Sequence, residues 1–300
     1  MQCIFRPCLK PIPLLSVSSG VLLLSTVGLS TRTTSSMATS KPVWPVKPYS
    51  PRHQAWPYKE SDFSRQDPSS DSSFYRAPRF VTHIDDAAIS TLKEYYADVL
   101  PTSGKALDFC SSWISHFPAS VEQAIARDEL KAIGMGMNQA ELEANDVLKH
   151  GRLLVDLNID PDVSAALVKA KVVDLSDPET LIDASTVVVS IDYLIQPVEV
   201  LSSVLKVTKP GGKVHLTISN RCFPTKAINR WLRISEEERL QMVGDFLHFA
   251  GWKDIELVEL SNGKDAGQPS SFVAQDFRGL MSMIGMNSRD PLWVVRATKA

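Results

Sequence analysis

Polar side chains that could do chemistry lie in short segments that follow predicted β-strands. A histidine or a carboxylate can remove a proton, a tyrosine or an asparagine can orient a ligand, and an arginine can bind an anion. Such chemistry needs reacting groups held about 3 Å apart, so the fold must bring these segments together. The candidates are His116, Asp192, Tyr193, Asn220, Arg221 and Cys222.

Several of these side chains also have purely structural interpretations. His116 can cap the turn before Pro118. Tyr193 can be a core aromatic residue with its hydroxyl at the rim, and Cys222 can be a small buried hydrophobic residue. Lys226 can open a helix and attract an anionic substrate, although lysine side chains are mostly exposed. The sequence leaves both interpretations of each residue open.

The segment 193–219 carries the clearest structural signal in the chain. Valines and leucines recur at helical spacing over 197–207, whereas apolar and polar residues alternate over 213–219, as in a strand. Pro210 prevents further helix, and the two glycines after it allow a tight reversal. A helix, a turn and a strand in this order form half of an α/β unit.

Strands and helices alternate through the rest of the chain as well. This alternation predicts an α/β fold, a doubly wound, mostly parallel sheet with helices on both faces. The last two strands could close the sheet as an antiparallel pair, and residues 171–177 fit either an additional edge strand or a packing insert. The expected strands are 105–109, 129–135, 152–157, 185–191, 213–219, 254–260 and 291–299. The expected helices include 83–100, 139–149, 197–207 and 235–250, of which 139–149 and 197–207 are the clearest.

Composition narrows the classes of partner. The chain has 300 residues, 44% of them hydrophobic, which is enough for one generous core. A formal net charge of −2 leaves no basic stripe for a phosphate backbone, so nucleic acid is not the expected partner. The four cysteines show no CxxC spacing, so neither a metal site nor a disulfide framework is indicated.

The N-terminal region differs in composition from the remainder. No Asp or Glu precedes Glu60, and a stretch around 30–40 is rich in Ser and Thr. This pattern suits an organellar transit peptide, of a chloroplast or a mitochondrion, over residues 1–40. A secretory signal and a cytoplasmic protein that starts at Met37 are the alternatives. The apolar stretch 12–29 is too interrupted to predict a membrane span.

An arm and one domain follow this leader. Residues 41–82 are rich in Pro, Ser and aromatic residues, which predicts an extended arm. The aromatic side chains would be costly to leave in water, so we expect the later part of the arm to pack along the domain. Residues 83–300 form the predicted α/β domain.

A ligand site is expected at one edge of the sheet. In doubly wound sheets, ligands bind at the carboxyl ends of the strands, near the point where the strand order reverses. This rule assigns the site to the segments that follow the five parallel strands. These segments are 108–118, 134–142, 156–158, 190–197 and 219–227.

The same segments carry a family resemblance. The runs ALDFCSSWISHFP, GMNQAELEAN, VDLN, DYLIQPVEV, KPGG and SNRCFPTKA, with FYRAPRFVTHIDD before them, resemble class I S-adenosylmethionine-dependent methyltransferases of the methyltransferase type 11-like kind, over about 56–298. The resemblance implies S-adenosyl-L-methionine as cofactor and methyl transfer to an unidentified small-molecule acceptor. The alternative is a non-catalytic protein of this fold that acts as a binding or scaffold protein. Catalytic residues and oligomeric state stay open.

The resemblance also assigns site residues. Some would line the acceptor pocket, and Trp113 among them could cover the cofactor or fill its space. The cofactor-binding candidates are Asp108, Cys110, Ser111, Ser112, Met137, Asn138, Asp156, Leu157, Asn158 and Ile191, and the acceptor-pocket candidates are Trp113, His116, Tyr193, Asn220 and Arg221.

Two departures from the class pattern affect this assignment. The class has an acidic residue and then alternating glycines after the first strand, whereas Cys110 and serines fill the glycine positions here. The class also has an acidic residue at the end of the second strand, where this chain has Gly136. Asn138 could contact the ribose weakly, or it could cap the following helix in a capping box with Glu141. A nicotinamide-dependent reductase is disfavoured, because no GxGxxG follows the first strand.

Overall fold

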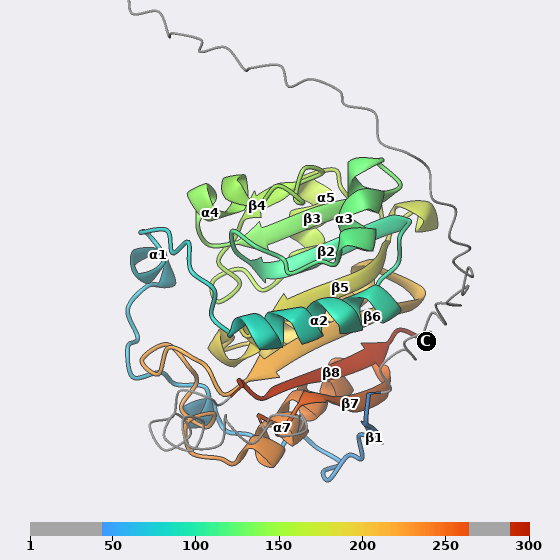
Figure 1. Ribbon diagram of the computed structural model, residues 1–300. Coiled ribbons are helices and arrows are strands. Elements are labelled where there is room, and N and C mark those ends of the chain that lie inside the picture. Colours follow the sequence, from blue (N-terminus) through green and yellow to red (C-terminus); the bar gives the residue numbers. More distant parts are fainter. Residues whose placement is uncertain (1–43, 264–288) are drawn as a thin grey trace, which may run out of the picture. The chain divides into compact units, whose positions relative to one another are not determined.

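One mixed sheet organises the part of the chain that the structure describes, residues 44–263 and 289–300 of a computed structural model (Figure 1). Its eight strands have the order β1-β7-β8-β6-β5-β2-β3-β4. Strands β4, β3, β2, β5 and β6 are mutually parallel, whereas β8 is antiparallel to β6 and β7, and β1 is antiparallel to β7. The strands are β1 Val46–Pro48, β2 Gly104–Ser111, β3 Leu130–Gly136, β4 Arg152–Leu154, β5 Ile182–Val188, β6 Thr208–Ser219, β7 Lys253–Ser261 and β8 Leu292–Thr298.

Helices cover both faces of this sheet, because its strands carry apolar side chains on both faces. On one face, Ala106 and Ala132 belong to a core shared with α2 and α3, and α2 crosses this face in Figure 1. On the other face, Leu107 and Ile133 belong to a core shared with α5, α6 and α7. The helices are α1 Asp71–Phe74, α2 Asp86–Val99, α3 Ala119–Ala126, α4 Gln139–Ala144, α5 Val163–Lys169, α6 Pro197–Val207 and α7 Glu236–Phe249, with short 3₁₀ turns at Glu60–Asp62, Pro178–Thr180 and Ile191–Tyr193.

The predicted doubly wound sheet with an antiparallel last strand is confirmed. Strands β3 and β4 lie on one side of β2, and β5 and β6 lie on the other, so the order reverses between β2 and β5. Strand β8 inserts between β6 and β7 and pairs with both. Residues 171–177 form no strand, and Val173 of this segment packs into the core instead.

The helix expected over 139–149 is shorter than its sequence pattern. It ends at Ala144, and the next residue, Asn145, has left the helical conformation. The Asn145 amide donates to the carbonyl of Ser112 at 2.9 Å and to Ser115 Oγ at 2.9 Å. The Arg152 guanidinium meanwhile donates to the carbonyls of Leu142 and Asn145. The Arg152 bonds satisfy carbonyls at the end of α4, and the Asn145 bonds hold the residue after the helix against the loop after β2.

The N-terminal arm packs on the domain from its first described residues. Strand β1 pairs with β7, with Val46 opposite Val258. The hydroxyls of Tyr49 and Tyr58 both donate to the Asp245 carboxylate in α7. The described residues, 44–263 and 289–300, all belong to one compact unit. The expected leader over 1–40, with its transit-peptide interpretation and the alternative start at Met37, lies outside the described residues.

Membrane association through a spanning helix has no support in the ranges 44–263 and 289–300. No helix there is both long enough and apolar enough to cross a bilayer.

Candidate active site

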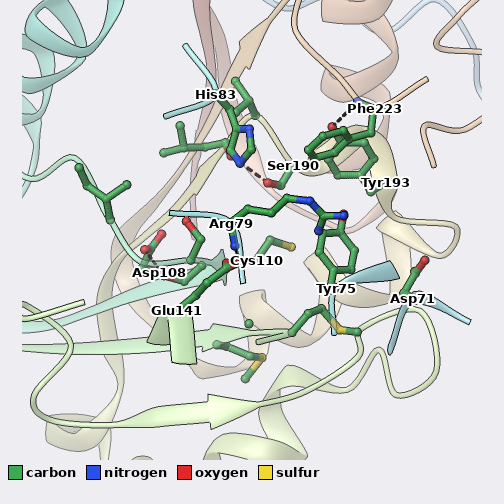
Figure 2. Close-up of a pocket in the computed structure, with 18 of the residues that line it drawn as sticks. Asp71, Tyr75, Arg79, His83, Asp108, Cys110, Glu141, Ser190, Tyr193 and Phe223 are labelled. Carbon is green, nitrogen blue, oxygen red and sulfur yellow. Dashed lines mark hydrogen bonds between the residues drawn. The ribbon is translucent and has the colours of Figure 1, made fainter. Parts of the chain in front are cut away.

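A cavity of about 350 Å³ lies at the carboxyl ends of β2, β3 and β5 (Figure 2). This is the size of a small-molecule site, and it lies where the strand order reverses. The strand tips supply its floor, and the arm segment 71–84 supplies another wall. The strand-tip residues around it include Asp108, Cys110, Ser111, Ser112, Ile114, His116, Met135, Gly136, Met137, Glu141, Val155, Asp156, Leu157, Asn158, Val188, Val189, Ser190, Tyr193, Arg221, Cys222 and Phe223.

Most of the candidates from the sequence line this cavity. Eight of the cofactor-binding candidates and three of the acceptor-pocket candidates do so, and Cys222 joins them. They are Asp108, Cys110, Ser111, Ser112, Met137, Asp156, Leu157 and Asn158, with His116, Tyr193 and Arg221.

Four candidates lie outside the cavity lining. The side chain of Asn138 caps α4, where it accepts from the N–H of Glu141, and its amide donates to the carbonyl of Tyr75. Ile191 is buried in the hydrophobic core, and Asn220 is exposed. Trp113 is outside the cavity lining, and its indole N–H donates at 3.0 Å to the carbonyl of Val81 in the arm wall. The indole therefore does not fill the hollow after β2.

Asp108 is the buried acid at the end of β2. Its carboxylate accepts hydrogen bonds from Ser111 Oγ at 2.6 Å, Ser115 Oγ at 2.7 Å and Thr186 Oγ1 at 3.1 Å. Burial raises its pKa to about 6, and the three hydroxyl donors oppose this shift. Asp108 thus holds the loop from Ser111 to Ser115 in place, and it shares β2 with Cys110.

Asp108 should make stability fall as pH rises. Its pKa is higher in the folded state than in the unfolded state, so the folded protein binds more protons between about pH 4 and pH 6. This contribution is complete below pH 4 and is lost as pH rises through about 6. Asp108→Asn should remove a pH-dependent loss of roughly 3 kcal/mol, visible when urea unfolding of both proteins is compared at pH 4 and pH 7. Parallel pH profiles for the two proteins would contradict it.

Three of the six non-glycine residues that have left-handed backbone conformations in the described ranges line the cavity. Cys110, His116 and Val189 have φ angles of 55°, 56° and 43°, and all three line it. Non-glycine residues with such angles are strained, most of all a β-branched one, and they cluster at functional sites. At Cys110 the pairing of β2 with β3 shifts by one residue, which is a β-bulge. Cys110 therefore keeps a glycine-like backbone at a glycine position of the class pattern.

The cavity also contains groups that stay neutral at physiological pH. Burial raises the pKa of the Cys110 thiol to about 12, so it is not a thiolate nucleophile. Burial lowers the pKa of His116 to about 4. Within the described residues the buried Nδ1 of His116 has no hydrogen-bond partner.

Asp192, another candidate from the sequence, is buried outside the cavity lining, and burial raises its pKa to about 7.

Gly136 brings two strand tips into close contact. A Cβ atom at this position would lie 2.2 Å from the backbone oxygen of Ser111, a distance that side chains do not tolerate. Any acidic residue here would push the end of β2 away. The absence of the class acid at this position therefore has a steric reason in this chain.

Glu141 is a cavity acid that the sequence did not assign to the site. Its carboxylate accepts from the backbone N–H of Arg79 at 2.6 Å, and burial raises its pKa. The expected capping box is consequently only half formed, because Asn138 accepts from Glu141 but the Glu141 carboxylate bonds to the arm. In the sequence, the position of Glu141 three residues after Asn138 could have indicated a special role. A helix-capping role explained this position equally well.

The sequence also did not assign to the site the part of the arm that forms one wall of the cavity. Tyr75, Arg79 and His83 line the cavity and come from the run FYRAPRFVTHIDD, which precedes the first parallel strand. Asn158 links this arm to the strand tips: its amide donates to Asp71 at 2.8 Å and to the carbonyl of Tyr193 at 3.0 Å. The polar atoms of the Asn158 side chain are thus engaged by the protein itself.

The end of β6 completes the wall. The N–H of Phe223 donates to the Tyr193 hydroxyl at 2.8 Å. Arg221 pairs with Asp290 at 2.8 Å. Lys226, expected either exposed or at a helix start, is fully buried in a turn and pairs with Asp67 and Asp71. Across the described ranges, no group of three or more His, Cys, Asp or Glu residues is placed to hold a metal ion.

The strand order, with the antiparallel β8 beside β6, defines the Rossmann-like class I methyltransferase fold that the sequence predicts. No protein-family model and no curated protein matches the chain.

Solved structures of methyltransferases align with the chain at low identity. Phosphoethanolamine N-methyltransferase 2 of Haemonchus contortus, in complex with S-adenosyl-L-methionine, is 15% identical with a TM-score of 0.40, and the alignment covers 71% of this chain and 52% of that one. A SAM-dependent methyltransferase from Archaeoglobus fulgidus is 13% identical with a TM-score of 0.41, covering 70% and 94%. Geranyl diphosphate C-methyltransferase from Streptomyces coelicolor A3(2) is 13% identical with a TM-score of 0.44, covering 76% and 97%. This chain thus spans about half the length of the Haemonchus protein.

Proposed function

We propose that the protein is an S-adenosylmethionine-dependent methyltransferase that acts on a small-molecule acceptor. The observation that carries this proposal is the open hollow at the tip of β2. Cys110 adopts a glycine-like backbone there, Gly136 allows the strand tips to meet, and Trp113 is outside the cavity lining. The substitutions that depart from the class pattern therefore leave the cavity accessible.

The chemistry of the cavity wall fits this cofactor. The ribose hydroxyls of S-adenosylmethionine need hydrogen-bond acceptors, and the carboxylates of Glu141 and Asp156 line the cavity. Met137 and Leu157 offer apolar surface to the adenine ring. When bound, the cofactor would supply an electrophilic methyl group. Glu141 would thus provide from α4 the acidic contact that Gly136 cannot.

The remaining residues would shape and orient the acceptor. Asp108 fixes the loop after β2 through its hydroxyl bonds. Tyr193 and Phe223 form an aromatic wall, with their rings 6.1 Å apart. His116 offers an unpaired Nδ1, and its low pKa suits it to accept a hydrogen bond from the acceptor better than to act as a base.

Binding of the cofactor or its product tests the proposal. Titration with S-adenosylhomocysteine should raise the melting temperature by mass action, equivalent to about 2.7 kcal/mol at a concentration of 100 times the Kd. Ser112→Arg should abolish this shift, because it places a long side chain in the cavity. Ser120→Arg, the same change at an exposed position of α3, should keep it.

A flat response of the wild-type protein at millimolar ligand would overturn the enzyme proposal. That result would favour the alternative, a binding or scaffold protein of the same fold. Equal loss of binding in both arginine variants would contradict the placement of the site.

A further inference from the structure

The guanidinium of Arg79 projects into the cavity and packs among aromatic rings. Its central carbon lies 4.4 Å from the ring centre of Phe74, 5.4 Å from that of Phe223 and 5.7 Å from that of Tyr75. Nη2 donates to the carbonyl of Phe74 at 3.0 Å. Figure 2 shows the side chain crossing from the Glu141 side toward Tyr75, away from Asp108. Stacking of this kind fixes the guanidinium in one orientation.

This guanidinium lacks a carboxylate partner. The Glu141 carboxylate bonds to the backbone N–H of Arg79, at the other end of the residue. The second arginine of the cavity wall, Arg221, is neutralised by Asp290, and Asp71 is paired with Arg65 and Lys226. No ion pair involves Arg79 within the ranges 44–263 and 289–300.

One donor atom of Arg79 is also unused. Nη1 is buried and has no hydrogen-bond partner among the described residues. A partly buried cation with a buried, unbonded donor is costly, because both its solvation and a hydrogen bond are lost. Such a group, in the wall of a cavity, is suited to a ligand that supplies the missing negative oxygen.

We propose that Arg79 binds the carboxylate or phosphate group of a small ligand in this cavity, through its guanidinium. The apolar part of this ligand would lie against Tyr75, Tyr193 and Phe223. Within the proposed function, on which this step rests, the ligand is the methyl acceptor, because the guanidinium points away from Asp108 of β2 in Figure 2. The acceptor is then an anionic molecule with an apolar or aromatic body.

Simple anions test this site without knowledge of the natural acceptor. Benzoate and phenyl phosphate would be titrated into the full chain, with and without S-adenosylhomocysteine, and benzamide would serve as the uncharged control. We expect at least one anion to raise the melting temperature and benzamide to leave it unchanged. Arg79→Met should weaken anion binding about tenfold or more, since a hydrogen bond to a charged group is lost.

Matched variants separate this effect from misfolding. Arg76→Met removes the same charge from the same segment, but Arg76 is exposed and outside the cavity lining, so binding should persist. Arg79→Lys keeps the charge without the planar fork and should retain part of the affinity. Circular dichroism of each variant would report its folding.

Three outcomes would overturn the inference. They are equal binding of benzamide and benzoate, full anion binding by Arg79→Met, and no response of the wild-type protein to either anion at millimolar concentration. The carboxylate of the cofactor is an alternative source of the anion that Arg79 binds.

A comparison of two cofactor analogues tests this alternative. If Arg79→Met weakened binding of S-adenosylhomocysteine but not of 5′-methylthioadenosine, which lacks that carboxylate, the assignment to the acceptor would be wrong. Arg79-dependent binding of benzoate without any response to S-adenosylhomocysteine would support the anion site and reject the methyltransferase proposal.

Discussion

Asp71→Ala is expected to lower the free energy of unfolding by about 3–5 kcal/mol, the cost of breaking a buried ion pair. Asp71 is only 4% exposed and accepts from Arg65 at 2.7 Å and from Asn158 at 2.8 Å. Its other oxygen lies 3.3 Å from Nζ of Lys226, which is fully buried. Without this carboxylate, the positive charges of Arg65 and Lys226 lack sufficient negative charge beside them. Urea unfolding followed by circular dichroism measures the loss.

Asp67→Ala is the matched control for this prediction. Asp67 also pairs with Lys226, at 3.1 Å, but 35% of its side chain is exposed. Water can replace much of its contribution, so we expect a much smaller loss than for Asp71→Ala. Equal losses for the two variants would mean that the buried network has little cooperative strength. Because Asp71 also lines the cavity and holds Asn158, its replacement should weaken ligand binding as well.

Gly136→Ala is expected to weaken binding of S-adenosylhomocysteine, because the added Cβ displaces a strand tip that lines the cavity. The added Cβ would approach the backbone oxygen of Ser111 to 2.2 Å, and backbone cannot yield as a flexible side chain does. The end of β2 must therefore move, and the loop that lines the cavity moves with it. Overpacking should also cost about 1–3 kcal/mol of stability. Calorimetric titration and urea unfolding give the two quantities.

Gly211→Ala provides the comparison. Gly211 has a φ of 78°, and no atom lies within 4 Å of its added Cβ. The substitution should cost only the backbone strain, about 1–2 kcal/mol, and leave ligand binding unchanged. Normal binding by Gly136→Ala would show that the contact between the tips of β2 and β3 does not shape the cavity.

Periodicity along the chain was sufficient to predict seven of the eight strands and the main helices, but not β1 or the end of α4. Alternation at spacings of 2 and 3.6 residues reports which face of an element is buried, and this depends on local sequence. The rule that ligands bind at the carboxyl ends of strands then led to the segments that contain Tyr193 and, through the family resemblance, Asp108 and Ser112, and all three residues line the cavity. Their roles toward a cofactor or an acceptor stay predictions.

Contacts between distant segments could not be predicted in this way. Arg79 and Glu141 are 62 residues apart, and Lys226 meets the arm across more than 150 residues. Nothing in local spacing distinguishes Lys226 from an exposed lysine, because its counterions come from the arm. Similarly, Asn145 ends α4 through bonds to the loop after β2, although the sequence pattern continues. Long-range polar partners decided each of these positions.

The pairing of β1 with β7 has a consequence for the behaviour of the protein in solution. Strand β7 would otherwise be the outer strand of the sheet, with a row of unpaired N–H and C=O groups that could template association with another chain. Val46–Pro48 covers part of that row, and its Pro48 cannot donate to a further strand. The edge strand on the opposite side of the sheet, β4, spans only three residues. Short edge strands on both sides of the sheet thus protect the molecule against edge-to-edge aggregation.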